Sequence, residues 1–290
     1  MKKLLITGAS GFLGGRAAAM LADRFGIVTP SHRDMDITDR EAVRRFFDAV
    51  RPDLVLHCAA MSDVGQCGRE PEKSWRINVD GSRNVAEASG ENGAKCLLCS
   101  SDQVYAGADG IEAHREEEDV TPAPLYGREK LTAERECLAV NPDCVMMRLT
   151  WMYDVRTMVP GEKSDFFRGL LARIASGEML RFSAHDRRGL TYVGDVVENL
   201  VPAFSIPGGV YNFGSPSTVP VGRTMFEAAK TIFTLAGLDP DRIECDEESF
   251  RDAPRNLCMD PAKLFSVGIR FPETAERVGE LLKAAKEMLP

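Results

Sequence analysis

The sequence predicts an α/β fold, in which a doubly wound parallel sheet has helices on both faces and is followed by a smaller C-terminal lobe. Strand-like and helical segments alternate through the first 150 residues. The strand-like segments are apolar at nearly every position, which is typical of strands buried on both faces. A glycine-rich turn joins the first strand to the first helix, as in sheets of this class that bind nucleotides.

The alternation assigns each element of this first domain, residues 1–150. Strands are expected at Lys3–Thr7, Gly26–Thr29, Leu54–His57, Lys95–Ser100 and Cys144–Leu149. Helices are expected at Phe12–Phe25, Arg40–Val50, Glu72–Glu91 and Leu125–Val140. Because parallel strands need long crossover connections, a helix after each strand favours a parallel sheet.

After Leu149 the pattern loosens, and residues 151–290 are expected to form the smaller lobe. Trp151–Asp165 shows no clear period, and Pro160 and Gly161 interrupt it. Further helices are expected at Ser164–Ser176, Gly194–Phe204, Val221–Ala236 and Glu273–Met288. Short segments near 190–215, such as Gly209–Phe213, are candidates to rejoin the sheet of the first domain.

Composition excludes several classes of protein. The 290 residues contain 36 Lys and Arg against 44 Asp and Glu, a net charge of −8, without a basic run. This argues against a protein that binds nucleic acid or an anionic membrane. No apolar stretch approaches the roughly 20 residues of a membrane helix, and the apolar start of the chain is too short for a signal peptide.

The eight cysteines are too dilute for a disulfide framework, so we expect free thiols in the reducing cytoplasm. Cys96 and Cys99 have CxxC spacing, but they fall on an expected strand, where positions i and i+3 face opposite sides. One metal ion would not easily reach both. No second CxxC or histidine pair completes a zinc site, so no metal is expected.

The turn after the first strand reads TGASGFLG at residues 7–14. Glycines at these positions allow backbone N–H groups to approach a pyrophosphate, which then lies at the positive end of the following helix. This predicts a dinucleotide site in a Rossmann-like domain. The alternative is a turn that serves only strand-to-helix packing. The expected contacts here are Gly8, Ser10, Gly11, Phe12, Leu13 and Gly14.

The end of the second strand indicates which dinucleotide is bound. NAD-binding folds usually place a carboxylate here to hold the ribose 2′-OH, whereas this chain has Pro30, Ser31, His32 and Arg33. A hydroxyl and two basic groups favour the 2′-phosphate of NADPH over NADH. Two alternatives remain: Arg33 is only solvated, or Asp34 supplies the carboxylate.

Further cofactor contacts are expected after the second and third strands. Asp36 is a candidate acceptor for the adenine amino group, with Ile37 beside it. The small residues Cys58, Ala59 and Ala60 would leave room for the cofactor. His57 and Asn78 have structural interpretations: a buried, hydrogen-bonded histidine, and an amide that bonds backbone near the site or caps its helix.

Three side chains form the predicted catalytic group. Tyr126 and Lys130 lie four residues apart at the start of an expected helix, hence on one face, and Ser101 ends the fourth strand. The lysine ammonium would lower the phenol pKa, and both residues would also contact the cofactor. The serine would donate a hydrogen bond to a substrate carbonyl as hydride arrives.

The chain resembles the extended short-chain dehydrogenase/reductase family over nearly its whole length. Within that family it is most similar to reductases of nucleotide-linked 4-keto-6-deoxy sugars. Single motifs are ordinary, but their order and spacing are specific. They read TGASGFLG, DITD, HCAA, RINVDGSRNVAEA, SSDQVYAG, YGREK, MRLTWMY, RRGLTYVGDV, GVYNFGS and NLCMDPAKL.

The resemblance implies an NADPH-dependent oxidoreductase whose Ser-Tyr-Lys triad is Ser101, Tyr126 and Lys130. It also implies that Asp102, Trp151 and Arg188 bind the nucleotide sugar. Two alternatives remain open for the last two residues. Trp151 has the alternative of a core or interface aromatic, and Arg188 that of a surface ion pair.

The chain departs from the family pattern at three places, and other functions of related proteins remain as alternatives. Gln103 stands where the family has an aromatic, Asp154 stands where it has glycine, and the order Ala253–Asn256 is unusual. Related dehydratases have Asp-Glu where this chain has Asp102 followed by Gln103, which argues against dehydration. The alternatives are a non-catalytic regulatory subunit that binds NADP and a nucleotide-sugar epimerase, and a homodimer is possible.

Overall fold

The computed structural model describes residues 1–108, 110–154, 166–216 and 224–288. Within them the chain forms two compact units, each assembled from three segments. Unit 1 contains Met1–Val104, Thr121–Leu149 and Val197–Tyr211. Unit 2 contains Tyr105–Val120, Thr150–Val196 and Asn212–Pro290. In the described part of the chain, no helix has the length and apolarity needed to cross a membrane.

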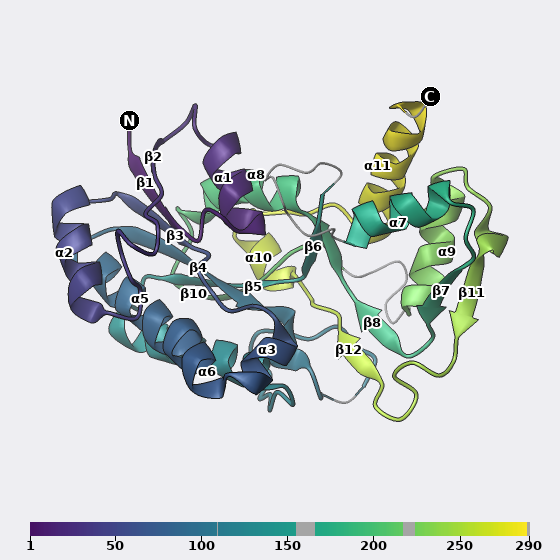
Figure 1. The fold of residues 1–290 in the computed structure, drawn as a ribbon, viewed down its shortest axis with the longest axis horizontal. Helices are drawn as coiled ribbons and strands as arrows, with labels where there is room; N and C mark the ends of the chain where they lie inside the picture. The colour runs from purple at the N-terminus through teal and green to yellow at the C-terminus, as the bar shows by residue number, and fades with distance from the viewer. Residues whose placement is uncertain (109, 155–165, 217–223, 289–290) are drawn as a thin grey trace. The chain divides into compact units, whose positions relative to one another are not determined.

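A six-stranded sheet with the order β10-β5-β4-β3-β1-β2 is the centre of unit 1 (Figure 1). The strands are β1 (Lys3–Thr7), β2 (Gly26–Val28), β3 (Leu54–His57), β4 (Lys95–Ser101), β5 (Val145–Leu149) and β10 (Gly209–Phe213). Parallel pairs join β2, β1, β3, β4 and β5. The strand order reverses at the β1–β3 pair, and such switch points are where doubly wound sheets bind ligands. This confirms the predicted fold class.

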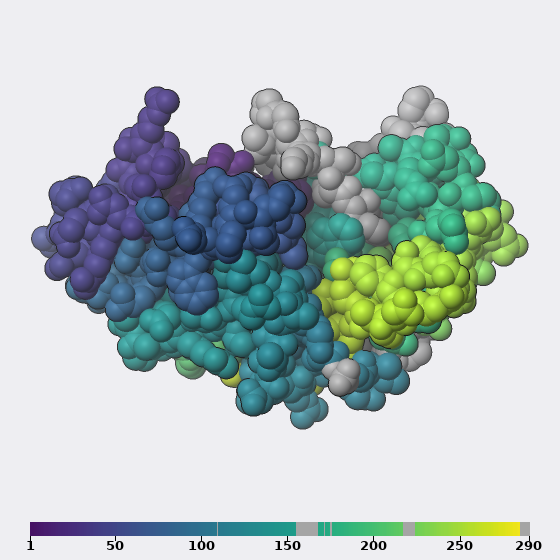
Figure 2. Space-filling model, turned by 60° about the horizontal axis from the view of Figure 1, so that its bottom comes forward, coloured from purple at the N-terminus to yellow at the C-terminus, as the bar shows by residue number. Residues whose placement is uncertain are grey.

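Helices cover both faces of this sheet (Figure 1). One face carries α2 (Arg40–Val50), α5 (Ser82–Glu91) and α6 (Leu125–Val140), and the other carries α1 (Phe12–Met20) and residues 197–203 of α8 (Val193–Ala203). In the view of Figure 2, the blue of residues 64–75 and the teal of α6 form much of the visible surface of unit 1. That surface includes α3 (Val64–Arg69) and α4 (Pro71–Trp75).

Local sequence explains these helices. Asp39 caps α2 by accepting hydrogen bonds from the backbone N–H groups of Glu41 and Ala42. Val43 and Phe47 lie four residues apart, on the same face of α2, and both are buried in the core against the sheet. Burial removes their apolar surface from water, which contributes about 1.5–3 kcal/mol for each side chain.

The expected helix over Glu72–Glu91 is not regular. It consists of α4, a π-helical segment at Arg76–Gly81 and α5. The extra residue of a π-helical turn redirects side chains, and here Asn78 is fully buried and bonds the backbone of Met61. Gly81 fits closely at the end of this segment, because a Cβ there would lie 2.8 Å from Ile37.

Other expected boundaries differ by a few residues. The first helix ends at Met20 instead of Phe25, whose ring packs edge-on against Phe204 at 6.4 Å. The later helices are α7 (Phe166–Ala175), α8, α9 (Met225–Leu235) and α11 (Thr274–Met288). Residues 155–165, Ser164 among them, and Val221 lie outside the described residues, so the expected pattern and helix starts there are not tested.

Three short parallel strand pairs and a separate core make up unit 2. The pairs are β6 (Trp151–Tyr153) with β9 (Leu190–Tyr192), β7 (Leu180–Ser183) with β11 (Ile243–Asp246), and β8 (Asp186–Arg188) with β12 (Arg255–Leu257). The core includes Tyr153, Leu190, Phe233 and Val278. Helix α9 begins with a capping box formed by Thr224 and Glu227. The small helix α10 spans Ala262–Ser266.

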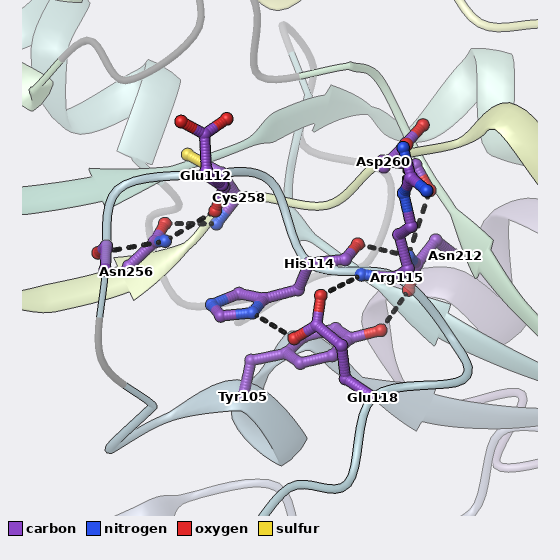
Figure 3. A network of polar contacts seen from close by, with 10 residues as sticks. Tyr105, Glu112, His114, Arg115, Glu118, Asn212, Asn256, Cys258 and Asp260 are labelled. Atoms are coloured by element: carbon purple, nitrogen blue, oxygen red, sulfur yellow. Dashed lines mark hydrogen bonds and ion pairs between the residues drawn. The ribbon is translucent and has the colours of Figure 1, made fainter.

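The segment between β4 and α6 joins unit 2 through a network of polar contacts (Figure 3). After the short 3₁₀ turn Asp102–Tyr105, the Tyr105 ring stacks on His114 at 4.6 Å. Tyr105 Oη donates to Asn212 Oδ1, and the Asn212 amide donates to the His114 and Asp260 carbonyls. His114 Nδ1 lies 2.7 Å from Glu118 Oε2. These bonds satisfy buried polar groups that would otherwise destabilise the fold.

Candidate functional site

A cleft of about 680 Å³ lies at the carboxyl ends of β1, β2 and β3 in unit 1. Three short chain segments supply most of its wall: residues 7–11, 29–38 and 58–60. The complete lining is Thr7, Gly8, Ala9, Ser10, Gly11, Thr29, Pro30, Ser31, His32, Met35, Asp36, Ile37, Thr38, Cys58, Ala59, Ala60 and Ile77. The volume suits a small organic ligand.

The glycine turn fits an approaching phosphate. Gly8 has a φ of +69°, and a Cβ there would lie 2.7 Å from the backbone nitrogen of Ala59. Only glycine therefore allows the turn to pack this tightly against the end of β3. Helix α1 begins at Phe12, and among the described residues no side chain caps it. Its first N–H groups can therefore receive an anion.

Eight of the predicted cofactor residues line this cleft: Gly8, Ser10, Gly11, Asp36, Ile37, Cys58, Ala59 and Ala60. Phe12, Leu13, Gly14, Arg33, Tyr126 and Lys130 are not among the lining residues. The apolar side chains of Met35 and Ile77 also line the cleft and were not predicted from the sequence. Neither belongs to a phosphate-binding motif, and only the fold brings Ile77 to the cleft.

The end of β2 presents a hydroxyl and an imidazole to the cleft, from Ser31 and His32. Arg33 is exposed beside them. Asp34 accepts hydrogen bonds from the Ser31 backbone and hydroxyl, so its carboxylate is already engaged. Burial acts to raise the pKa of Asp36, but hydrogen bonds from Thr38 outweigh it and hold the pKa below its usual range. Asp36 is thus a charged acceptor in the cleft.

The structure brings Ser101, Tyr126 and Lys130 together. All three are buried, Ser101 at the end of β4 and the other two on α6. The Ser101 side chain is near enough to Tyr126 to lower the pKa of the phenol. The Lys130 Nζ lies 5.6 Å from the Tyr126 ring centroid and donates to the Cys99 carbonyl oxygen at 2.9 Å. Strand β4 therefore positions both partners of the phenol.

The predicted direction of the Tyr126 pKa is wrong. Burial raises the pKa of this phenol above its usual value, and the carboxylate of Asp102 raises it further, while the Ser101 side chain acts in the opposite direction. The ammonium that was expected to lower it instead bonds the Cys99 carbonyl, and burial lowers the pKa of Lys130 itself. Burial destabilises both the Tyr126 phenolate and the Lys130 ammonium, because each is charged. Tyr126 consequently holds its proton throughout the neutral range.

Asp102 lies directly beside this group. Its Oδ1 accepts from Ser101 Oγ at 3.2 Å and from Gln103 Nε2 at 3.4 Å. Asp102 is buried, so its charge acts on Tyr126 through a medium that screens weakly.

Gly127 explains how closely α6 approaches the turn after β4. A Cβ at this position would overlap the Gln103 backbone carbonyl and would lie 2.8 Å from Pro122. A larger residue would push the helix away from Ser101, so the glycine between Tyr126 and Arg128 is a packing requirement of the site.

Two networks of buried hydrogen bonds involve residues close to the site in the sequence. His57 bonds the Thr7 hydroxyl at 2.8 Å and the Ser82 hydroxyl at 3.2 Å, and burial lowers its pKa to about 3. This supports the structural interpretation of that histidine. Glu129, which was not predicted, is fully buried and accepts from Ser74 Oγ at 2.5 Å and Asn78 Nδ2 at 2.7 Å. No local pattern revealed it, because its partners lie more than 50 residues away.

The two predicted substrate residues of unit 2 are neighbours. The guanidinium carbon of Arg188 lies 4.8 Å from the Trp151 ring centroid, close enough for a cation–π contact. Arg188 Nε lies 3.6 Å from Asp186, which also binds Arg255 through both carboxylate oxygens. Trp151 remains 43% exposed. Two guanidinium groups, those of Arg188 and Arg255, contact the carboxylate of Asp186.

Comparisons with known proteins show the family of the chain. The family profile described as the RmlD substrate binding domain matches residues 1–286. The dTDP-4-dehydrorhamnose reductase of Mycolicibacterium smegmatis is 31% identical over 88% of this chain and 76% of its own. That of Streptomyces griseus is 32% identical over 82% of this chain and 78% of its own.

A solved structure shares the fold. It is the dTDP-4-dehydrorhamnose reductase of Bacillus anthracis in complex with NADP, with a TM-score of 0.81 and 24% identity, covering 98% of this chain and 99% of the other. The family profile covers nearly the whole chain, and relatives above 30% identity cover most of it. The chain therefore belongs to the RmlD substrate binding domain family, within the extended short-chain dehydrogenases/reductases that its motifs resemble.

Proposed function

We propose that this protein reduces the keto group of a nucleotide-linked 4-keto-6-deoxy sugar with NADPH, as an oxidoreductase. The observation that carries the proposal is the buried group of Ser101, Tyr126 and Lys130 at the end of β4. The cofactor cleft is adjacent, because Cys58 of its wall contacts Cys99, whose carbonyl anchors Lys130. Relatives named dTDP-4-dehydrorhamnose reductase support the class of substrate.

The cleft residues fit NADPH. The glycine turn offers backbone N–H groups to the pyrophosphate. Gly8 packs directly against Ala59, which leaves no room for a Cβ at this position. Ser31, His32 and the neighbouring Arg33 are candidates for the 2′-phosphate, and Asp36 for the adenine amino group. NADPH, when bound, supplies the hydride that the reaction requires.

The protein's own groups manage the oxygen of the substrate carbonyl. Ser101 donates a hydrogen bond to that oxygen as negative charge develops on it. Tyr126 then gives its phenolic proton to the oxygen, because a phenol carries its proton at neutral pH. Lys130, fixed by the Cys99 carbonyl, keeps its ammonium 5.6 Å from the Tyr126 ring and is proposed to contact the cofactor.

Two residues of unit 2 are proposed to contact the nucleotide sugar. Arg188 presents a guanidinium for the pyrophosphate of the nucleotide sugar, and the exposed Trp151 face provides a stacking surface. Asp102 is proposed to contact the sugar near the reacting carbon. We also propose a homodimer, supported by the large apolar side chain of Trp75, which is 41% exposed on α4. The eight free cysteines support a location in the reducing cytoplasm.

The direct test incubates the purified protein with NADPH and dTDP-4-dehydro-6-deoxy sugars and follows the loss of NADPH absorbance, with identification of the sugar product. We expect stoichiometric oxidation of NADPH and a sugar reduced at C4. An epimerised sugar with NADPH unchanged would support the epimerase. Tight NADPH binding without turnover of several nucleotide sugars would support the regulatory subunit instead.

A further inference from the structure

Two thiols meet at the wall of the cofactor cleft. Cys58 follows β3 and Cys99 lies in β4, and their Sγ atoms are 3.6 Å apart. The register pairs His57 with Leu98, so the two cysteines are the next residues along neighbouring strands. Such strands lie about 4.8 Å apart, which is within the range of roughly 4.4–6.8 Å between Cα atoms that a disulfide spans.

This pair is more accessible than most of the other cysteines. Cys58 and Cys99 are partly exposed, and Cys58 lines the cleft. Five of the remaining six are buried, and the sixth, Cys245, belongs to unit 2. Cys96, the CxxC partner of Cys99 in the sequence, is in the core on the other side of the sheet. The relevant pair is therefore formed between strands, not within one.

The surroundings favour a thiolate on Cys99. The thiol contact with Cys58 lowers the pKa of Cys99 more than burial raises it, and the Lys130 ammonium lowers the pKa of both thiols. The same contact and burial raise the pKa of Cys58. Because the thiolate is the nucleophile in thiol oxidation, Cys99 is the side chain that reacts first.

We propose that Cys58 and Cys99 form a reversible oxidation site whose oxidant is a hydroperoxide. The Cys99 thiolate attacks a peroxide oxygen, the O–O bond breaks, and Cys99 becomes a sulfenic acid while the second oxygen leaves as water or an alcohol. Cys58 then attacks the sulfenic sulfur, the S–S bond forms, and water leaves. Two sulfurs are oxidised by one electron each, and the peroxide is reduced by two electrons.

A disulfide here would act on the cofactor cleft. Bond formation shortens the sulfur separation from 3.6 Å to about 2.05 Å. Ala59, next to Cys58, packs against the glycine turn at Gly8, and Cys99 holds Lys130 through its carbonyl. The oxidised protein should therefore bind NADP less well. Disulfide formation itself is independent of the proposed reaction, whereas any effect on turnover rests on it.

The test treats the reduced protein with hydrogen peroxide, with and without saturating NADP⁺, and compares the wild type with Cys58→Ser, Cys99→Ser and the control Cys245→Ser. We expect the wild type and Cys245→Ser to lose two hydrogens by intact mass and to yield a Cys58–Cys99 linked peptide. NADP⁺ should slow this reaction. Cys58→Ser should stop at a sulfenic acid on Cys99 that dimedone traps.

A second measurement titrates NADP⁺ into the oxidised wild type, before and after dithiothreitol. We expect weakened binding that dithiothreitol restores. Absence of the linked peptide, or equal oxidation with NADP⁺ present, would overturn the site. Unchanged NADP⁺ affinity in the oxidised protein would overturn its effect on the cleft. None of these measurements depends on turnover. They would therefore still test the oxidation site if the proposed reductase activity were not found.

Discussion

The two units build their proposed ligand sites in different ways. In unit 1 the cleft is built from backbone and small side chains at the ends of adjacent parallel strands, with Gly8 and Ala59 in close contact. In unit 2 the cluster around Arg188 uses long charged and aromatic side chains from short strands. A backbone cradle suits a cofactor common to many proteins. A cluster of side chains can change while the fold is retained, which suits a variable substrate.

This difference separates the expected effects of substitution. Changes in unit 1 should alter cofactor binding or the chemical step, and changes around Arg188 should alter the Michaelis constant for the nucleotide sugar alone. The largest effect is expected where the chemistry occurs.

Tyr126→Phe removes the proposed proton donor but keeps the ring. We expect kcat to fall by about 10²–10⁴, the usual contribution of a general acid, with the NADPH dissociation constant nearly unchanged. Measuring kcat and cofactor titration on the same preparation distinguishes the two. Turnover within a few fold of the wild type would exclude Tyr126 as the donor.

Gly8→Ala tests the backbone cradle. Alanine at a φ of +69° costs about 1–2 kcal/mol, and its Cβ would also meet the Ala59 nitrogen at 2.7 Å. We expect the strain to displace the turn from the position that holds the pyrophosphate, so that NADPH affinity falls by about tenfold, which corresponds to about 1.4 kcal/mol of binding free energy. Gly68→Ala in α3 is the matched control, because its Cβ would meet no atom within 4 Å. Equal affinities for both variants would contradict the cradle.

Arg188→Ala tests the cluster of unit 2. Loss of one charge-assisted hydrogen bond to a phosphate costs about 1.5–3 kcal/mol, so the Michaelis constant for the sugar should rise about 10- to 100-fold. NADPH binding should not change. Arg181→Ala, an exposed arginine on β7, serves as the control. A variant that loses thermal stability while it keeps its Michaelis constant would assign Arg188 to the ion pair with Asp186 instead.

The difference between the two units also explains which features could be predicted from the sequence. The glycine turn and the Tyr126–Lys130 pair are local, since each lies within one turn or helix whose start the residues themselves specify. The strands of unit 1 were placed within a residue or two because they are apolar throughout. Trp151 and Arg188 were assigned only through resemblance, and the structure shows them 4.8 Å apart.

What sequence reasoning missed depends on long-range contact. Glu129 shares its buried network with Ser74 and Asn78, from a different part of the chain. Cys58 and Cys99 meet only because β3 and β4 pair in this register. The Tyr126 pKa was given the wrong direction because spacing along a helix shows which groups are near but not how deeply they are buried.

The smallest expected effect concerns the free energy of unfolding. It tests whether the buried His57 of unit 1 makes that free energy depend on pH. His57 has a pKa of about 3 in the folded protein, because burial and Lys130 disfavour its charged form, against about 6.5 when unfolded. Between these values the unfolded state binds the additional proton. The free energy of unfolding should therefore fall as pH decreases below about 6.5, by about 1.4 kcal/mol per pH unit from this group.

Denaturant titrations at several pH values between about 5 and 7 measure this slope in the wild type, in His57→Gln and in the control His32→Gln. His32 is exposed, so His32→Gln controls for the loss of a histidine from the surface. His57→Gln should flatten the slope, whatever its effect on absolute stability, because the buried group that would have to accept a proton is gone. An unchanged slope in His57→Gln would mean that His57 is protonated in the folded protein. In that case its bonds to Thr7 and Ser82 would have to be those of a charged imidazolium beside Lys130.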